Sequence, residues 1–169
     1  TSTPAQKLSV VGTIESTTGG IKFPDGSTQT VAAPTTFPSF SVHKNGTDQT
    51  VAYDTFVKVT WSTEEWDTNS NFANDKFTPT VAGKYSLDAT VVLAETGSIV
   101  LAIYKNGVIY KQFTHKTTTT HNANTISVSV DANGSTDYFE VYINNSAVDP
   151  SGTIYGLAAA TFFQGHKEP

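Results

Sequence analysis

The stretch Ile99-Val-Leu-Ala-Ile-Tyr-Lys-Asn-Gly-Val-Ile-Tyr110 contains the pattern that decides the fold class. Ile99, Leu101 and Ile103 alternate with other residues, and a period of two places them on one face of an extended strand. The dipeptide Asn106-Gly107 follows them. Between two strand-like segments, Asn-Gly is the strongest short signal for a β-hairpin. The stretch therefore predicts two antiparallel strands with one buried face.

The same alternation occurs three more times in the chain. The alternating apolar sets are Val57, Val59, Trp61; Ile126, Val128, Val130; and Phe139, Val141, Ile143. Further turn signals stand at Asn45-Gly46, Ala82-Gly83 and Asn133-Gly134. Roughly eight short strands over about 130 residues are typical of a two-sheet sandwich. We therefore predict an all-β fold, a two-sheet jelly-roll sandwich.

Composition agrees with this fold class and excludes several functions. Charged residues make up 15% of the chain, against a usual ~25%, and Thr, Ser, Asn and Gly take their place. A net charge of −5 with 10 scattered basic residues disfavours nucleic acid and anionic membrane surfaces as partners. The chain has no Cys, which excludes a disulfide framework, a thiolate zinc site and a cysteine nucleophile.

The N-terminus lacks the features of a secretory signal. TSTPAQK has neither the charged nor the apolar region of a signal sequence, and no apolar run approaches the ~20 residues that span a bilayer. The chain begins at Thr1 and contains no Met. We therefore expect a complete product made in the cytoplasm, although a trimmed chain would look the same.

The first 36 residues differ from the rest of the chain. They predict short strands at residues 8–15, 21–23 and 28–31, separated by Gly19-Gly20 and by Pro24-Asp25-Gly26. The apolar residues are too few for an independent core, so this segment needs a partner to fold against. We expect residues 1–36 to be an attachment segment and linker, residues 37–169 to be the head, and the anchor positions to be Val10, Ile14, Ile21 and Phe23.

Two loops and a set of aromatic residues suggest a subunit interface. We predict loops at residues 115–125 and 147–160, and the second contains Ile154, Tyr155 and Leu157. Apolar side chains in a loop need a cover, and a neighbouring subunit would provide one. Aromatic residues could instead stack on carbohydrate, but buried interfaces also favour them. The predicted interface residues are Phe40, Tyr85, Tyr104, Tyr138, Tyr142, Tyr155, Leu157 and Phe163.

Catalytic and metal-binding motifs are weak or missing. No nucleophile or phosphate-loop motif is present, and the run Glu64-Glu65-x-Asp67 could be a paired-carboxylate hydrolase site but is better interpreted as a solvated loop. We expect no enzyme activity and no cofactor. Calcium binding is an alternative that the sequence leaves open. Hard cations need oxygen ligands, and the candidates are Glu64, Asp67, Asp131, Asp137 and Asp149. A three-fold axis could gather histidines from His43, His115, His121 and His166.

The order of several short motifs resembles the globular head of complement component one, subcomponent q, a tumour-necrosis-factor-like jelly roll. Residues 40–42 resemble the first strand of that head, residues 77–85 its Phe-Thr-x-Pro…Gly-x-Tyr signature, and residues 103–107 its Asn-Gly hairpin. Residues 137–141 resemble its Gly-Asp-x-Val strand, and residues 161–165 resemble its closing strand. This resemblance covers residues 37–167 and implies a trimeric head. The sequence departs from the family's motifs at two places: Pro79 directly follows Thr78, and Thr136 replaces the Gly before Asp137.

The segment before the head resembles a short element of phage fibres and other virion-associated proteins, on residues 10–14 and 20–30. Together the two resemblances imply a structural virion protein of a bacteriophage: a trimeric fibre, head-fibre or capsid-decoration appendage. Its expected partners are other virion proteins, bound through residues 1–33, and a host surface glycan or protein. The alternatives are a bacterial carbohydrate-binding lectin-like module that is not attached to a virion and, less favoured, a hydrolase.

Overall fold

The computed structural model describes residues 18–29, 37–94, 96–146 and 151–169, and the chain divides into two units, Thr1–Thr35 and Thr36–Pro169. The predicted strand at residues 8–15, the anchor positions Val10 and Ile14, and the calcium candidate Asp149 lie outside the described residues. No described segment forms a helix with the length and hydropathy needed to cross a membrane.

The described part of the first unit is a small hairpin. Strand β1 (Ile21–Lys22) pairs antiparallel with β2 (Thr28–Gln29). In the turn, the carboxylate of Asp25 accepts hydrogen bonds from the backbone N–H (2.9 Å) and the hydroxyl (2.6 Å) of Ser27, which lower the pKa of Asp25. Ile21 and Phe23 are 47% and 45% exposed, so the described residues of this unit do not bury either side chain.

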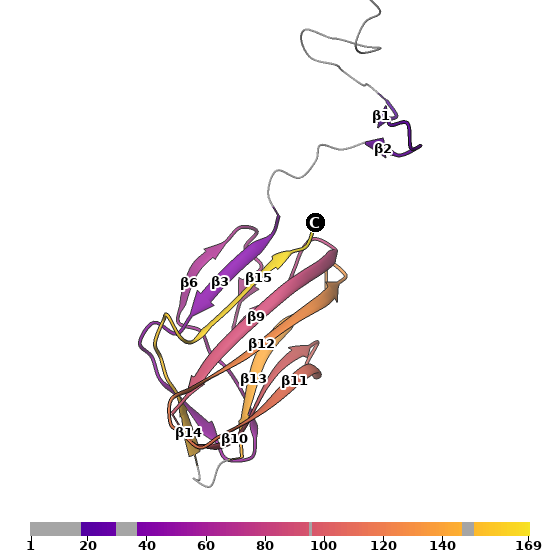
Figure 1. Cartoon of the computed structure of the whole chain (residues 1–169). Coiled ribbons are helices and arrows are strands. Elements are labelled where there is room, and N and C mark those ends of the chain that lie inside the picture. The colour runs from indigo at the N-terminus through magenta and orange to yellow at the C-terminus, as the bar shows by residue number, and fades with distance from the viewer. Residues whose placement is uncertain (1–17, 30–36, 95, 147–150) are drawn as a thin grey trace, which may run out of the picture. The chain divides into compact units, whose positions relative to one another are not determined.

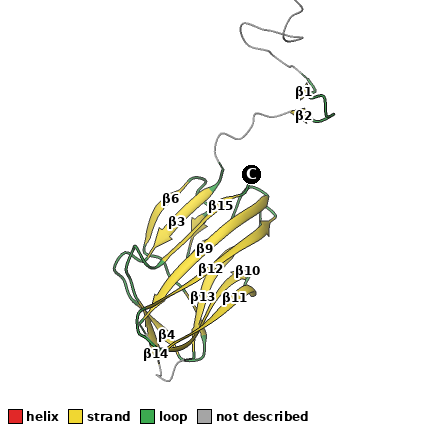
Figure 2. Ribbon diagram, viewed as in Figure 1, coloured by secondary structure: helices red, strands yellow, loops and turns green. Residues whose placement is uncertain are grey.

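The second unit is a sandwich of two antiparallel sheets, and none of its described residues is helical (Figures 1 and 2). The seven-stranded sheet has the order β4-β14-β9-β15-β3-β6, with β12 on the other side of β9. Its strands are β3 (Ser39–His43), β4 (Gln49–Ala52), β6 (Thr63–Asp67), β9 (Gly83–Leu93), β12 (Asn122–Ala132), β14 (Ser151–Ile154) and β15 (Phe162–Lys167). The predicted all-β, two-sheet jelly roll is confirmed.

The six-stranded sheet has the order β11-β10-β13-β8-β7, and β5 also pairs with β13. Its strands are β5 (Phe56–Lys58), β7 (Phe72–Ala73), β8 (Lys76–Phe77), β10 (Gly97–Lys105), β11 (Val108–Thr117) and β13 (Phe139–Asn145). The hairpin predicted at Asn106-Gly107 joins β10 to β11, and both turn residues have positive φ, 55° and 79°. Asn and Gly tolerate this left-handed conformation best.

The core lies between the sheets and contains the predicted alternating residues. Leu101, Ile103, Phe139 and Ile143 are all fully buried. At one end, Phe40 stacks on Phe77 with ring centroids 4.3 Å apart and contacts the rings of Phe72 and Phe163. Burial of one side chain of this size contributes about 1.5–3 kcal/mol, so the head has a substantial core of its own.

Both predicted loops contain strand residues. β11 extends to Thr117 and β12 starts at Asn122, so the Thr-rich turn is shorter than residues 115–125. Residues 151–154 form β14, which pairs with β4, and Ile154 is fully buried in the core of its own chain. The apolar character of this segment is therefore explained in part within one subunit, where we had expected a neighbour to cover it.

Candidate functional site

A β-sandwich has two open sides, where edge strands of the two sheets face one another. On one side these strands are β11 and β12: β11 ends the six-stranded sheet, and β12 pairs along its whole length with β9 and with no other described strand. On the other side they are β7 and β6, which end the two sheets there. Each open side has a groove, and the two grooves differ in chemistry.

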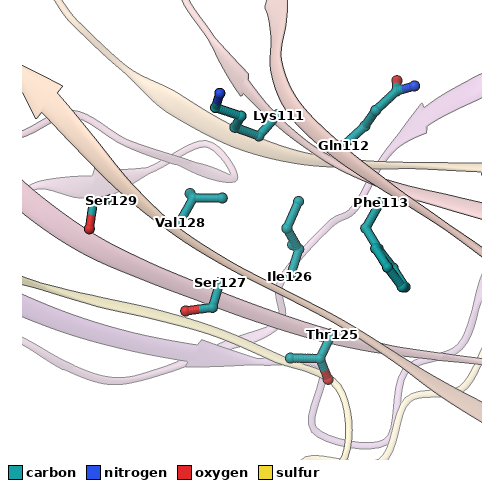
Figure 3. Close-up of a pocket in the computed structure, with 8 residues that line it drawn as sticks. All are labelled: Lys111, Gln112, Phe113, Thr125, Ile126, Ser127, Val128 and Ser129. Carbon is teal, nitrogen blue, oxygen red and sulfur yellow. The ribbon is translucent and has the colours of Figure 1, made fainter.

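The groove between β11 and β12 has a volume of about 420 Å³. It is lined by Lys111, Gln112 and Phe113 from β11 and by residues 125–129 from β12. Figure 3 shows Ile126 and Val128 pointing from β12 toward the side on which Lys111 and Phe113 lie. Because β12 alternates, Thr125, Ser127 and Ser129 are exposed, whereas Ile126 is buried. The floor of the groove is therefore apolar.

Exposed apolar side chains gather on β11 beside this groove. Val108 is 66% exposed, Ile109 45%, Tyr110 37% and Phe113 51%. Several large apolar side chains exposed on one strand mark an interaction surface, because water is a poor environment for them. We call these four residues together with Ile126 and Val128 the β11 edge, and it is the candidate subunit interface.

The β11 edge was not among the predicted interface residues, although the sequence contains a signal for it. Val108, Ile109 and Tyr110 are consecutive. A strand with one buried face alternates apolar and polar residues, whereas consecutive apolar residues indicate that both faces are covered. In a single chain only one face of β11 has the sandwich behind it, so the second cover must come from outside.

Three of the predicted interface residues lie in the core of a single chain. Phe40, Tyr85 and Phe163 are fully buried within one chain. Phe40 and Phe163 are 4.9 Å apart between ring centroids in the core, and the Tyr85 hydroxyl donates to the carbonyl oxygen of Val81 at 2.7 Å. Burial also raises the pKa of Tyr85. These side chains fill the core of the subunit and have no surface left for a neighbour.

The other predicted interface residues are partly or well exposed, but they do not form one surface. Tyr104 and Tyr142 stack with ring centroids 4.0 Å apart. Burial raises the pKa of both tyrosines. Tyr138 lies under the Lys76 ammonium. Tyr155 contacts His121 edge to face at 4.8 Å, near the exposed Leu157. Their role in an interface stays a prediction.

The acidic run on β6 does not converge on one point. Glu65 Oε2 accepts a hydrogen bond from the Ser41 hydroxyl at 2.7 Å, whereas Asp67 accepts from the backbone N–H of Phe72 at 2.7 Å. Glu64 lines the groove between β6 and β7. The register of β6 against β3 shifts within this run, which places Glu65 on the outward face beside Ser41. Of the three carboxyl residues only Glu64 lines the groove, so the run does not offer a pair of carboxylates there.

The histidines and the acidic calcium candidates are also dispersed. His43 is buried on β3, 3.9 Å from the Glu65 carboxylate, His115 stacks on Phe113, and His166 is exposed near the end of β15. The carboxylate of Asp137 accepts hydrogen bonds from the Asn106 side chain and the backbone N–H of Asn133, and it forms an ion pair with Lys105. Among the residues that the structure describes, no three His, Asp or Glu side chains gather into a group that could hold a metal.

Comparisons with known proteins identify the fold. No protein-family model matches the sequence, and no curated protein sequence matches it. The crystal structure of murine APRIL is similar over 79% of this chain and all of that chain, with a TM-score of 0.61 at 12% identity. The globular domain of zebrafish complement 1qA is similar over 76% of this chain and 94% of that chain, with a TM-score of 0.57 at 16% identity.

A third similar structure is the vertex protein P5 of PRD1. It matches 79% of this chain and 96% of that chain, with a TM-score of 0.50 at 12% identity. The described head thus has the fold of the tumour-necrosis-factor-like and complement-q jelly rolls, as its motifs predicted. These three similar proteins do not have enzyme folds.

Proposed function

We propose that this chain is a structural protein of a phage particle, a homotrimeric appendage with a displayed jelly-roll head. The observation that carries the proposal is the uncovered apolar β11 edge on a jelly-roll head. Heads of this fold are typically trimers, and a further subunit is the cover that such an edge requires. A vertex protein of the phage PRD1 shares the fold, which supports a place on a virion.

In a trimer with three-fold symmetry the contact between subunits is heterologous, so the β11 edge of one subunit meets a different surface of the next. That surface is the outward face of the seven-stranded sheet. Strand pairing aligns one row across this face, in the order Trp66, Ser41, Gln164, Asp88, Ser127. Trp66 is 48% exposed beside a depression of about 170 Å³ that Gln164 and His166 also line. Heterologous contacts close into a ring when the rotation allows it.

Residues 1–33 attach the trimer to other virion proteins of the capsid or tail. In the described hairpin, Ile21 and Phe23 are exposed on and beside β1. A two-stranded hairpin is marginal by itself in water, so its apolar side chains gain stability by packing against another protein. The head then extends from the particle and contacts a glycan or protein of the host surface.

The alternative is a bacterial carbohydrate-binding module that is not attached to a particle. The groove between β6 and β7, which combines aromatic and carboxylate side chains, favours it. Both functions allow a trimer, so oligomeric state alone does not separate them.

Cryo-electron microscopy of purified particles from the phage that encodes the chain tests the proposal. We expect trimeric density of the size of the head on the particle surface, with residues 1–33 contacting a capsid or tail protein. Particles that lack this chain by mass spectrometry, while the chain accumulates in the lysate, would refute the virion assignment and favour the free module.

A further inference from the structure

The second open side of the sandwich has a groove of about 320 Å³ between β6 and β7. Its walls include the aromatic rings of Trp61 and Phe72, the hydroxyl residues Ser62 and Thr63, and the carboxyl residues Glu64 and Asp75. None of the four polar residues lies in the β11 edge, which is on the opposite side of the sandwich. Contacts made by the β11 edge therefore do not use the residues of this groove in the same chain.

The aromatic part of the groove is fixed by the core. Trp61 and Phe72 are only partly buried, and both pack against the core cluster. Their ring centroids lie 5.9 Å and 6.2 Å from that of the buried Phe163. Rings that are held from behind in this way provide a surface that needs no rearrangement before a ligand binds, which lowers the entropic cost of binding.

Asp75 is held by the backbone beside Trp61. Asn74 and Asp75 form the turn between β7 and β8, and both have positive φ, 53° and 58°. One carboxylate oxygen of Asp75 accepts the backbone N–H of Trp61 at 2.8 Å. The other oxygen, Oδ2, is not used by that bond.

Glu64 also lines the groove, and a buried lysine, Lys44, lies near Asp75 behind it. Lys44 is fully buried and donates to Gln49 Oε1 and to the carbonyl oxygen of Thr60, both at 2.9 Å. Burial lowers its pKa, and attraction to Asp75 opposes that shift. Glu64 is exposed, and its side chain makes no hydrogen bond or ion pair with the described residues.

A pyranose ring has the complementary chemistry. Its C–H face packs on aromatic rings, and its hydroxyl groups donate strong hydrogen bonds to carboxylates. A ligand site combines an apolar wall with a few placed polar groups in this manner. Two carboxylates also repel an anionic sugar, because an unpaired negative charge beside them would be costly to desolvate.

We propose that the groove between β6 and β7 binds an uncharged sugar ring, which packs on Trp61 and donates hydroxyl hydrogen bonds to Glu64 and Asp75. This inference rests on the proposed function, since it names the class of surface ligand that the head contacts. All residues of the groove belong to the head, so sugar binding can be measured with the purified protein in the absence of a particle.

The chain supplies matched controls for this site on the same strand. Glu65 neighbours Glu64 but contacts Ser41 and His43 on the outward face of the sheet. Trp66 pairs with Ser41 on that same face. The protein has two tryptophans, so Trp66→Phe leaves Trp61 as the single tryptophan reporter in the groove. Trp66 also lies in the proposed subunit contact, so light scattering must first show that the variant is still a trimer.

The experiment titrates the full-length Trp66→Phe protein with the methyl glycosides of glucose, galactose, mannose and N-acetylglucosamine, and with N-acetylneuraminic acid as the anionic probe. Trp61 fluorescence and saturation-transfer NMR report binding. We expect at least one neutral glycoside to bind and the anionic sugar not to bind. Glu64→Gln and Asp75→Asn should each weaken binding about tenfold, while Glu65→Gln leaves it unchanged. Asn at position 75 keeps an oxygen for the Trp61 N–H, so the turn is preserved.

Three results would overturn the inference: no response to any neutral glycoside, binding of the anionic sugar alone, or equal losses in the Glu64→Gln and Glu65→Gln variants. Its failure is distinct from that of the proposed function. A chain found on particles that binds no sugar removes only this site. Sugar binding by a chain that is absent from particles leaves the site intact and removes the virion assignment.

Discussion

The ammonium of Lys105 lies 2.9 Å from Oδ2 of Asp137, which connects the β10–β11 hairpin to the segment before β13. Asp137 also accepts hydrogen bonds from the Asn106 side chain at 2.8 Å and from the backbone N–H of Asn133 at 3.0 Å. One buried carboxylate thus holds two turns at the same end of the head.

The Asp137→Asn variant should lower the free energy of unfolding by about 1–3 kcal/mol at neutral pH, because it weakens hydrogen bonds to a charged acceptor. The hydrogen bond from Asn106, followed by that from Lys105, lowers the pKa of Asp137 in the folded state. A lowered carboxyl pKa stabilises the fold above the unfolded pKa of ~3.9, and this contribution is lost as the pH falls through the lower folded value. Urea unfolding of both proteins from pH 7 to pH 3 measures the difference, which should shrink below about pH 4. A difference independent of pH would show that the charge has no role.

Leu101→Ala and Phe139→Ala should each destabilise the head by about 2–5 kcal/mol, because truncation of a fully buried side chain leaves a cavity. Thr114→Ala, at an exposed position on the neighbouring strand β11, serves as the control and should change stability by less than about 0.5 kcal/mol. Reversible denaturant unfolding provides the values. Equal effects at all three positions would mean that the assignment of strand faces is incorrect.

Phe113→Glu should dissociate the trimer, because it places a charge in the apolar β11 edge at a position that is 51% exposed in one chain. Light scattering should give about three times the chain mass of 18.1 kDa for the unmodified protein and one chain mass for the variant. Val81→Glu introduces the same charge at an exposed apolar residue outside the groove and should remain trimeric. A monomeric unmodified protein would contradict the proposed assembly.

The local patterns in the sequence were sufficient for the sandwich but not for its surfaces. Alternation assigned Leu101 and Phe139 to the core, and Asn106-Gly107 located a hairpin, because both depend on short-range backbone geometry. The sequence analysis assigned Phe40 to the subunit interface and Ile154 to a loop that a neighbouring subunit covers. Both side chains are in the core of one chain. Their burial depends on pairing between strands that are far apart in the sequence, and local sequence patterns do not show which strands pair.

The groove between β6 and β7 illustrates the same limit. Glu64 and Glu65 are adjacent and chemically identical in the sequence, yet one lines the groove and the other contacts Ser41. Asp75 reaches Trp61 only because two consecutive left-handed residues reverse the chain between β7 and β8. Neither the face of β6 nor this turn had a signal as clear as Asn-Gly, so the site could be found only after folding had placed these residues together.

Attachment through residues 1–33 is the property that separates a virion protein from a free module. Ile21 and Phe23 are exposed in the described hairpin, and an apolar hairpin in water gains most by packing against a partner. Deletion of residues 1–33 should therefore yield a folded trimeric head that is absent from purified particles, because the core lies within residues 37–169. The double variant Ile21→Ser, Phe23→Ser should reduce the copy number on particles, whereas Lys22→Ser between them should not. Quantitative mass spectrometry of the particles measures incorporation, and sugar binding by the deleted protein checks that its head is intact. Normal incorporation of the deleted protein would transfer the attachment role to the head itself, and the β11 edge would then be the first surface to test for that contact.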